Sequence, residues 1–125
     1  MASVHDDQTK LQGSLKTTSG GTYNIHEIQA ANGVVLREYV SSSGKVFGVA
    51  WQGRTHPDLR QVLGPYYDQY VQAVQAQRAQ RHSHGPLHIE QSGLVVEMAG
   101  HMGSLMGRAF LPQGLPAGIR PEEIR

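Results

Sequence analysis

The sequence predicts a single α+β domain: an antiparallel β meander, one long kinked helix and a second antiparallel β group, with the helix packed on the sheet. Three observations predict it. The chain has 125 residues, the usual size of one domain. Residues 56–80 form its only long stretch with helical periodicity. On both sides of that stretch, short apolar runs are separated by turns rich in glycine and serine, as strands are.

The domain itself is expected to span residues 22–112. Residues 1–21 contain few apolar side chains and are interpreted as a flexible arm, with at most a weak strand or helical turn near residues 11–15. Prolines and glycines are frequent after residue 112 and end regular structure. Residues 113–125 are therefore interpreted as a C-terminal tail.

Three strands are expected before the helix, at residues 23–29, 34–40 and 45–51. Asn32-Gly33 joins the first two as a hairpin, because a type I′ turn needs positive φ at both central residues. A serine-rich turn ending in Gly44 joins the second strand to the third.

The third strand has small residues on one side, namely Val46, Gly48 and Ala50. Small side chains let another element approach closely, and the helix is the expected neighbour. For the acidic residues inside strands, Glu38 and Glu97, a position facing solvent is the preferred interpretation.

The helical stretch presents one apolar stripe, because its apolar residues recur every three or four positions. These are Leu59, Val62, Leu63, Tyr66, Tyr67, Tyr70, Val71 and Val74. Thr55 or His56 is expected as the N-cap, with Pro57 at the first helical position. Gly64-Pro65 interrupts the pattern, so a kink or two consecutive helices facing one core are expected.

Three more strands are expected after the helix, at residues 87–90, 94–99 and 105–111. The segment 100–103, Gly-His-Met-Gly, lies between two of them and is interpreted as a turn or β-bulge. Whether the two strand groups form one sheet or two stays open at this point.

Composition excludes several functional classes. Eleven basic and ten acidic residues give a net charge of +1 with no long run of either sign, unlike a nucleic-acid binder or a polybasic membrane anchor. The apolar runs are far shorter than the ~20 residues that span a bilayer, so we expect a soluble protein. The absence of cysteine excludes thiol catalysis, thiolate metal sites and disulfides. Hydrolase and nucleotide-binding motifs are also absent, which favours a non-catalytic protein over an enzyme.

Several short motifs, taken together, resemble those of a known protein family. They are Arg37-Glu38-Tyr39-Val40, Val46-Phe47-Gly48-Val49-Ala50-Trp51, Pro57-Asp58-Leu59, Gly100-His101-Met102 and Gly107-Arg108-Ala109. In this order the chain resembles a small bacterial family of unknown function whose members are usually made with a cleavable signal peptide. The likeness runs from about Tyr23 to Ile119. It implies export, with the leader missing from this sequence, and hence a periplasmic or secreted protein; it implies no activity.

Two groups of residues are candidate sites. Trp51, Tyr66, Tyr67 and Arg108 could form a surface for a ligand or partner, although aromatic residues at helical spacing are also typical of a core. His82, His84 and His88, with His101 or Glu90 as a further ligand, could bind zinc, copper or nickel, although a solvated polar loop is the preferred interpretation. Arg37 and Arg108 could pair with Glu38, Glu97 or a ligand carboxylate.

Two functional hypotheses follow. The first is a non-catalytic exported protein that binds or supports a cell-envelope partner, with a homodimer contact as one way to cover an apolar patch. The second is a small-ligand or metal-binding protein that uses the histidine-rich loop. The second requires a concave pocket with converging polar groups. No cofactor is required by the first.

Overall fold

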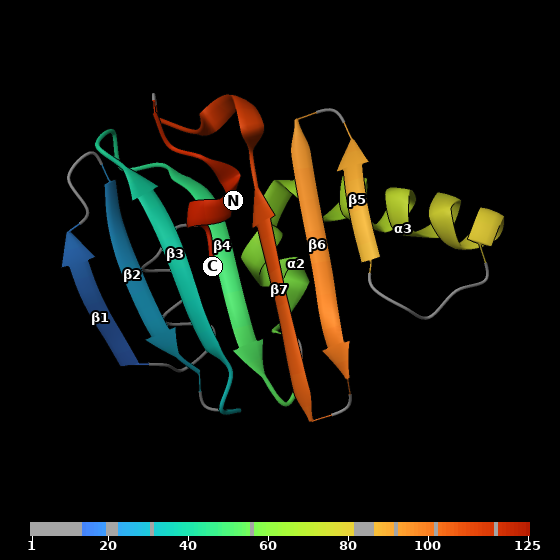
Figure 1. The fold of residues 1–125 in the computed structure, drawn as a ribbon, viewed down its shortest axis with the longest axis horizontal. Helices are drawn as coiled ribbons and strands as arrows, with labels where there is room; N and C mark the ends of the chain where they lie inside the picture. Colours follow the sequence, from blue (N-terminus) through green and yellow to red (C-terminus); the bar gives the residue numbers. More distant parts are fainter. Residues whose placement is uncertain are drawn as a thin grey trace.

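The computed structural model describes residues 14–19, 23–30, 32–55, 57–81, 87–91, 93–101, 103–116 and 118–125. Within them lies one antiparallel sheet of seven strands, in the order β1-β2-β3-β4-β7-β6-β5 (Figure 1). The strands are β1 (Ser14–Ser19), β2 (Tyr23–Gln29), β3 (Val35–Ser41), β4 (Val46–Gly53), β5 (Leu87–Gln91), β6 (Leu94–His101) and β7 (Ser104–Phe110). The α+β class predicted from the sequence is confirmed.

The two predicted strand groups form a single sheet, because β4 pairs with β7 from Gly48↔Phe110 to Gly53↔Leu105. The strands expected on either side of the helix are all present. One further strand, β1, pairs with β2 along its whole length, from Ser14↔Gln29 to Ser19↔Asn24. This differs from the interpretation of residues 1–21 as a flexible arm, and the physical reason is that edge strands need only one neighbour and can be polar.

A hairpin joins β2 to β3, but it is not the expected two-residue type I′ turn centred on Asn32-Gly33. The N–H of Gly33 donates to the Ala30 oxygen at 3.0 Å and the N–H of Ala30 donates to the Val34 oxygen at 2.9 Å, so the loop lies between Ala30 and Val34. Gly33 has φ of 87°, a conformation that glycine adopts without steric cost. The Asn32 Oδ1 accepts a hydrogen bond of 3.1 Å from the backbone N–H of Val34. The local sequence therefore sets the register of this hairpin.

The helical stretch consists of α2 (Leu59–Leu63), the 3₁₀ turn η1 (Gly64–Tyr66) and α3 (Tyr67–Arg81). Its N-cap is Asp58, whose Oδ1 accepts a hydrogen bond of 3.1 Å from the N–H of Arg60. The prediction of Thr55 or His56 as N-cap is wrong, because the aspartate carboxylate satisfies the first-turn donor instead. Among the described residues, no helix is both long and apolar enough to cross a membrane.

The helices pack on one face of the sheet, which we call the helix face. Val62, Leu63 and Val74 of the apolar stripe are buried there against strand residues, with Leu59, Tyr66, Tyr67 and Tyr70 partly buried around them. The strand residues include Leu36, Val49 and Trp51. The expectation that the helix packs on Gly48 and Ala50 is therefore wrong, because these residues point to the other side of β4.

The opposite face, which we call the outer face, is partly covered by the C-terminal segment, residues 111–125. Ile124 is fully buried in a second cluster with Tyr39, Phe47, Ala50, Val95 and Phe110. A β-carbon on Gly48 would lie 2.7 Å from Cδ1 of Ile124, so the small residue admits this side chain. In Figure 1 the segment, drawn in red, crosses β3, β4 and β7 on the side away from α3. Part of the predicted tail thus contributes to the core.

Glu38 differs from its expected solvent-facing position, because only 1% of the residue is exposed. It lies on the helix face, directly opposite Val49 in β4 and His26 in β2. The alternation of β3 places it on the same side as Leu36 and Val40. The alternation of side chains along the strand, and not the charge of Glu38, therefore determines on which face of the sheet Glu38 lies.

Candidate ligand-binding site

One cross-strand row of the outer face carries most of the charge near the centre of the sheet. Register pairs Arg37 with Ala50, Ala50 with Arg108, Arg108 with Glu97, and Glu97 with His88. Side chains that are directly opposite in an antiparallel sheet share one face and lie within contact distance. Five strands therefore present these five residues side by side. We call them the charged row.

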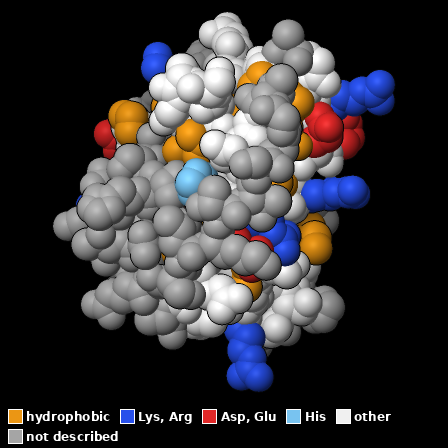
Figure 2. Space-filling view, turned by 90° about the vertical axis from the view of Figure 1, so that its left-hand side faces the viewer, with side chains coloured by type: hydrophobic (Ala, Val, Ile, Leu, Met, Phe, Trp, Pro, Cys, Tyr) orange, Lys and Arg blue, Asp and Glu red, His pale blue; other side chains and the backbone are white. Residues whose placement is uncertain are grey.

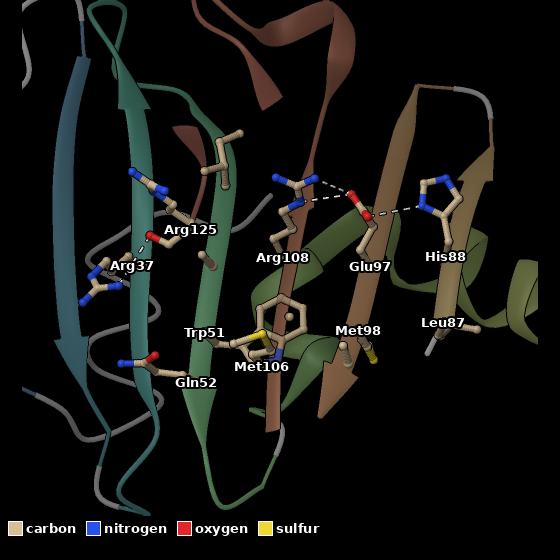
Figure 3. Close-up of a pocket in the computed structure, with 14 residues that line it drawn as sticks. Arg37, Trp51, Gln52, Leu87, His88, Glu97, Met98, Met106, Arg108 and Arg125 are labelled. Carbon is tan, nitrogen blue, oxygen red and sulfur yellow. Dashed lines mark hydrogen bonds and ion pairs between the residues drawn. The ribbon is translucent and has the colours of Figure 1, made fainter. Parts of the chain in front are cut away.

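A hollow of about 730 Å³ opens over the charged row. Besides the row itself, its lining includes Gln52, Ala99, Met106 and Arg125. Figure 3 shows these side chains rising from β3, β4, β7, β6 and β5, with Arg125 contributed by the C-terminal segment. Small-molecule sites are typically about 300–1,000 Å³. The hollow is thus of a size that suits a small molecule.

Arg108 is held firmly in this row. Its Nε and Nη2 both donate to Glu97 Oε1, at 3.0 Å and 2.7 Å. Its Nη1 donates to the backbone oxygen of Pro121 at 2.8 Å, which ties the C-terminal segment to β7. Charge-assisted hydrogen bonds of this length are among the stronger ones in proteins. The guanidinium is consequently fixed in direction.

Glu97 is bound from both sides. Arg108 contacts Oε1, and His88 Nδ1 lies 3.5 Å from Oε2 (Figure 3). Burial raises the pKa of Glu97, but the hydrogen bond and charge of Arg108, helped by His88, outweigh it and hold the pKa below its ordinary value of 4.5. Glu97 is therefore an anion at neutral pH, and it neutralises Arg108.

Arg37, at the other end of the charged row, is held loosely. Its Nε lies 3.6 Å from Glu27 Oε2, and its Nη1 donates to the backbone oxygen of Arg125 at 3.4 Å. Its side chain is 35% exposed. Both contacts are longer than those of Arg108, so the Arg37 guanidinium is freer to meet a ligand.

The C-terminal segment forms one wall of the hollow and is anchored by Tyr39. The Tyr39 hydroxyl donates to the backbone oxygen of Arg125 at 3.0 Å and accepts from its N–H at 3.2 Å. Tyr23 packs on Tyr39 with ring centroids 5.8 Å apart. Burial raises the pKa of Tyr23, and the charge of Glu123 adds to this effect. Aromatic contacts thus support this wall from β2 and β3.

Of the four residues predicted as a ligand or partner surface, Arg108 and Trp51 both line the hollow. Trp51 is nevertheless only 3% exposed and belongs to the core of the helix face, where its ring covers Gly107. Tyr66 and Tyr67 also lie on the helix side, and Tyr66 borders a separate cavity of about 540 Å³. Of this set, the structure associates Arg108 with a network of charged groups.

The predicted zinc ligands fall mostly outside the described part of the chain. His82 and His84 lie outside the described residues, as does the side chain of His101. His88 is described and contacts Glu97 and Glu90, at 3.5 Å and 3.7 Å. Where side chains are described, no group of three or more possible ligands is arranged to hold a metal ion. The zinc site stays a prediction, to be tested by zinc titration during thermal unfolding.

Glu97 is one of the partners that the sequence suggests for Arg108, and the structure confirms this pair. Sequence reasoning did not find the pairing of Arg37 with Glu27, nor the role of Ala50 between the two arginines. The signal for Glu27 was available, because the Asn32-Gly33 hairpin places Glu27 opposite Arg37. The signal for Ala50 was not, since it depends on β4 meeting β7.

Comparison with known proteins identifies a family. A family model with the description "Protein of unknown function (DUF2844)" matches residues 1–124. Neither the curated proteins nor the solved structures contain a match to this chain.

Proposed function

We propose that this chain, which belongs to the family of proteins of unknown function DUF2844, is a non-catalytic protein that binds a small molecule in the hollow of the outer face. The observation that carries the proposal is the convergence of Arg37, Arg108, Glu97 and His88 on a cavity of about 730 Å³. A concave site with a few polar groups on an otherwise apolar lining is typical of ligand binding. This feature favours the ligand hypothesis over an envelope partner.

The state of Glu97 supports binding rather than catalysis. A general acid or base works best when its pKa lies near the operating pH. The pKa of Glu97 is instead lowered, because Arg108 and His88 stabilise the carboxylate against the effect of burial. Its chemistry is that of a fixed counter-ion which orients Arg108.

The site of action belongs to the same proposal. We propose that the protein acts in the periplasm or is secreted by bacteria, on the basis of the resemblance alone. Fractionation of cells that express the natural gene, with N-terminal sequencing of the mature chain, tests this. Mature protein in the cytoplasm with an intact N-terminus would contradict export and leave the binding proposal standing.

Binding in the hollow is tested by screening a library of small organic molecules against ¹⁵N-labelled protein. We expect the molecules that bind to shift the amide resonances of Ala50, Ala99 and Met106, which line the hollow. Ala99→Trp would fill the space and abolish these shifts, whereas Gln75→Trp, on the exposed side of α3, would preserve them. Shifts confined to other surfaces would contradict the proposal.

A further inference from the structure

Basic and acidic side chains are balanced in the hollow and among its ion-pair partners. The guanidinium groups of Arg37, Arg108 and Arg125 line it together with the carboxylate of Glu97. Glu27 pairs with Arg37, and Glu90 lies 3.7 Å from His88. Figure 2 shows the molecule from the side of β1, and Lys or Arg side chains with neighbouring Asp or Glu side chains extend along its right-hand profile, the side of the outer face. A negatively charged ligand is therefore favoured by the hydrogen-bond donors that a particular guanidinium group presents, and not by net charge.

The two arginines of the charged row flank a short side chain. Arg37 and Arg108 are both register partners of Ala50, so their backbones lie two strand spacings apart, about 10 Å. Between them Ala50 offers only a methyl group, which is 4% exposed because it packs in the cluster that contains Ile124. Arg37, Ala50 and Arg108 all line the hollow, so an anionic group can enter it beside this methyl group and reach Arg37.

The two arginines would contribute differently. Arg108 is fixed by three hydrogen bonds of 2.7–3.0 Å. Arg37 has five N–H donors, and within the described residues it makes one hydrogen bond, at 3.4 Å. Its ion pair with Glu27 spans 3.6 Å and is partly exposed. Arg37 can therefore offer a pair of parallel N–H groups to a carboxylate, the geometry that guanidinium binds best.

The apolar end of the hollow lies next to this anion position. Met106 is 56% exposed, which makes it the large hydrophobic side chain of the described residues that is most accessible. It precedes Arg108 by two positions on β7 and shares its face, with Gln52 and Ala99 opposite it on the neighbouring strands. Methionine adapts its shape to an apolar ligand. The surface thus changes from charged to apolar along the strand direction.

We infer that the hollow binds a monocarboxylate with an apolar body: the carboxylate contacts Arg37 above Ala50, and the body lies across Met106 and Ala99. This inference rests on the proposed function and names the chemical class of its ligand. Arg108 is a positioning residue that closes the far side of the carboxylate position, and Glu97 keeps its guanidinium in place.

Three probes test the inference by titration against ¹⁵N-labelled protein. Octanoate carries both features, octanamide has the same shape without the charge, and acetate has the charge without the apolar body. We expect octanoate, below its micellar concentration, to shift the resonances of Ala50 and Met106 with the lowest Kd. Octanamide and acetate should each bind at least about tenfold more weakly, because each lacks one of the two contacts.

A matched pair of variants locates the carboxylate. Arg37→Gln should raise the Kd for octanoate at least about tenfold and leave the Kd for octanamide unchanged. Arg54→Gln, which removes the same charge from an exposed position outside the lining of the hollow, should leave both values unchanged. Circular dichroism of both variants confirms that each one is folded.

The outcomes separate the inference from the proposed function. Equal binding of octanoate and octanamide in the hollow, with no effect of Arg37→Gln, would overturn the carboxylate inference and support the proposed function. If Arg37→Gln and Arg54→Gln raised the Kd for octanoate equally, net charge alone would explain the binding. That result would overturn the role of Arg37. No shift in the hollow with any of the probes, combined with an empty library screen, would overturn both.

Discussion

The two faces of the sheet are covered by different kinds of structure. The helix face is covered by α2 and α3, in which the regular backbone hydrogen bonds run within each helix. The outer face is covered over part of its area by residues 111–125. Within the described part of this segment, the backbone hydrogen bonds after Leu111 are local, as in Ile119 N–H to Pro116 O and Ile124 N–H to Pro121 O. It is fastened to the sheet by side chains.

These fastenings are few and specific. Ile124 occupies the space above Gly48, Arg108 binds the backbone oxygen of Pro121, and Tyr39 binds the backbone of Arg125. A helix face with a continuous apolar cluster supplies most of the stability of such a domain. The outer face is only partly covered, and the uncovered part contains an open, charged hollow. Stability is therefore expected to depend mainly on the helix face, whereas the proposed binding site lies on the outer face.

The largest contrast should come from two side chains that are both fully buried, Leu63 on the helix face and Ile124 on the outer face. Leu63→Ala should lower the free energy of unfolding by about 3 kcal/mol, because it leaves a cavity in a continuous core. Ile124→Ala should cost about half as much, since the C-terminal segment can detach locally and limit the loss. Urea unfolding followed by fluorescence of Trp51, the one tryptophan, measures both. Equal losses would show that the two faces unfold as one unit.

Two glycines, one on each face of the sheet, test the same contrast through smaller expected losses of stability. A β-carbon on Gly107 would collide with the indole of Trp51 on the helix face, and one on Gly48 would meet the flexible end of Ile124. Because the indole is rigid and packed, Gly107→Ala should destabilise the protein by about 2 kcal/mol. Gly48→Ala should cost less than about 1 kcal/mol, because the Ile124 side chain can turn aside. The midpoints of thermal unfolding should fall in this order, and the reverse order would refute the contrast.

The contacts of Glu97 with Arg108 and His88 on the outer face should contribute a smaller, pH-dependent part of the free energy of unfolding. Because the folded-state pKa of Glu97 is lowered, its stabilisation is present above the ordinary value of 4.5 and is lost as the pH falls through the folded-state pKa. Glu97→Gln should therefore cost about 1 kcal/mol at pH 7, and this difference should shrink below pH 4.5. The comparison is made by urea unfolding at several pH values. Glu90→Gln, at a side chain that is 74% exposed, serves as control and should show almost no difference.

The smallest effect on stability is expected at Arg37. Its ion pair with Glu27 is 3.6 Å long and partly exposed, so Arg37→Gln should change the free energy of unfolding by less than about 0.5 kcal/mol. The same variant is expected to bind octanoate at least about tenfold more weakly. A loss of stability as large as that of Leu63→Ala would mean that Arg37 holds the fold together and would remove the division of roles between the faces.

The elements that the sequence predicted well are those decided by neighbouring residues. Asn32-Gly33 encodes a turn by its backbone preference, and the apolar stripe from Leu59 to Val74 encodes a helix with one buried side. The pair Arg108–Glu97 was one of several pairings considered, because both residues are central in strands. Such features need no knowledge of how distant segments meet.

The failures concern contacts between distant segments. The residue that covers Gly48 is Ile124, and no local pattern connects these two positions. The strand alternation placed Glu38 on the side of Leu36, but its charge led to the opposite interpretation. The hollow could not be predicted from the sequence, because it forms only when β3, β4, β7, β6 and β5 lie side by side. Its position also depends on which part of the outer face the C-terminal segment leaves uncovered.

The junction of β4 and β7 also has a consequence for how the chain folds. The other ladders connect strands that are neighbours in sequence, whereas this one joins Gly53 to Leu105 across a loop of about fifty residues. Closing such a loop costs conformational entropy before any contact repays it, and non-local pairing slows folding. The meander β1–β4 and the meander β5–β7 should form early, and their meeting should limit the rate. Trp51 and Gly107 lie opposite each other on this ladder, so a change there should retard folding as well as weaken the folded state.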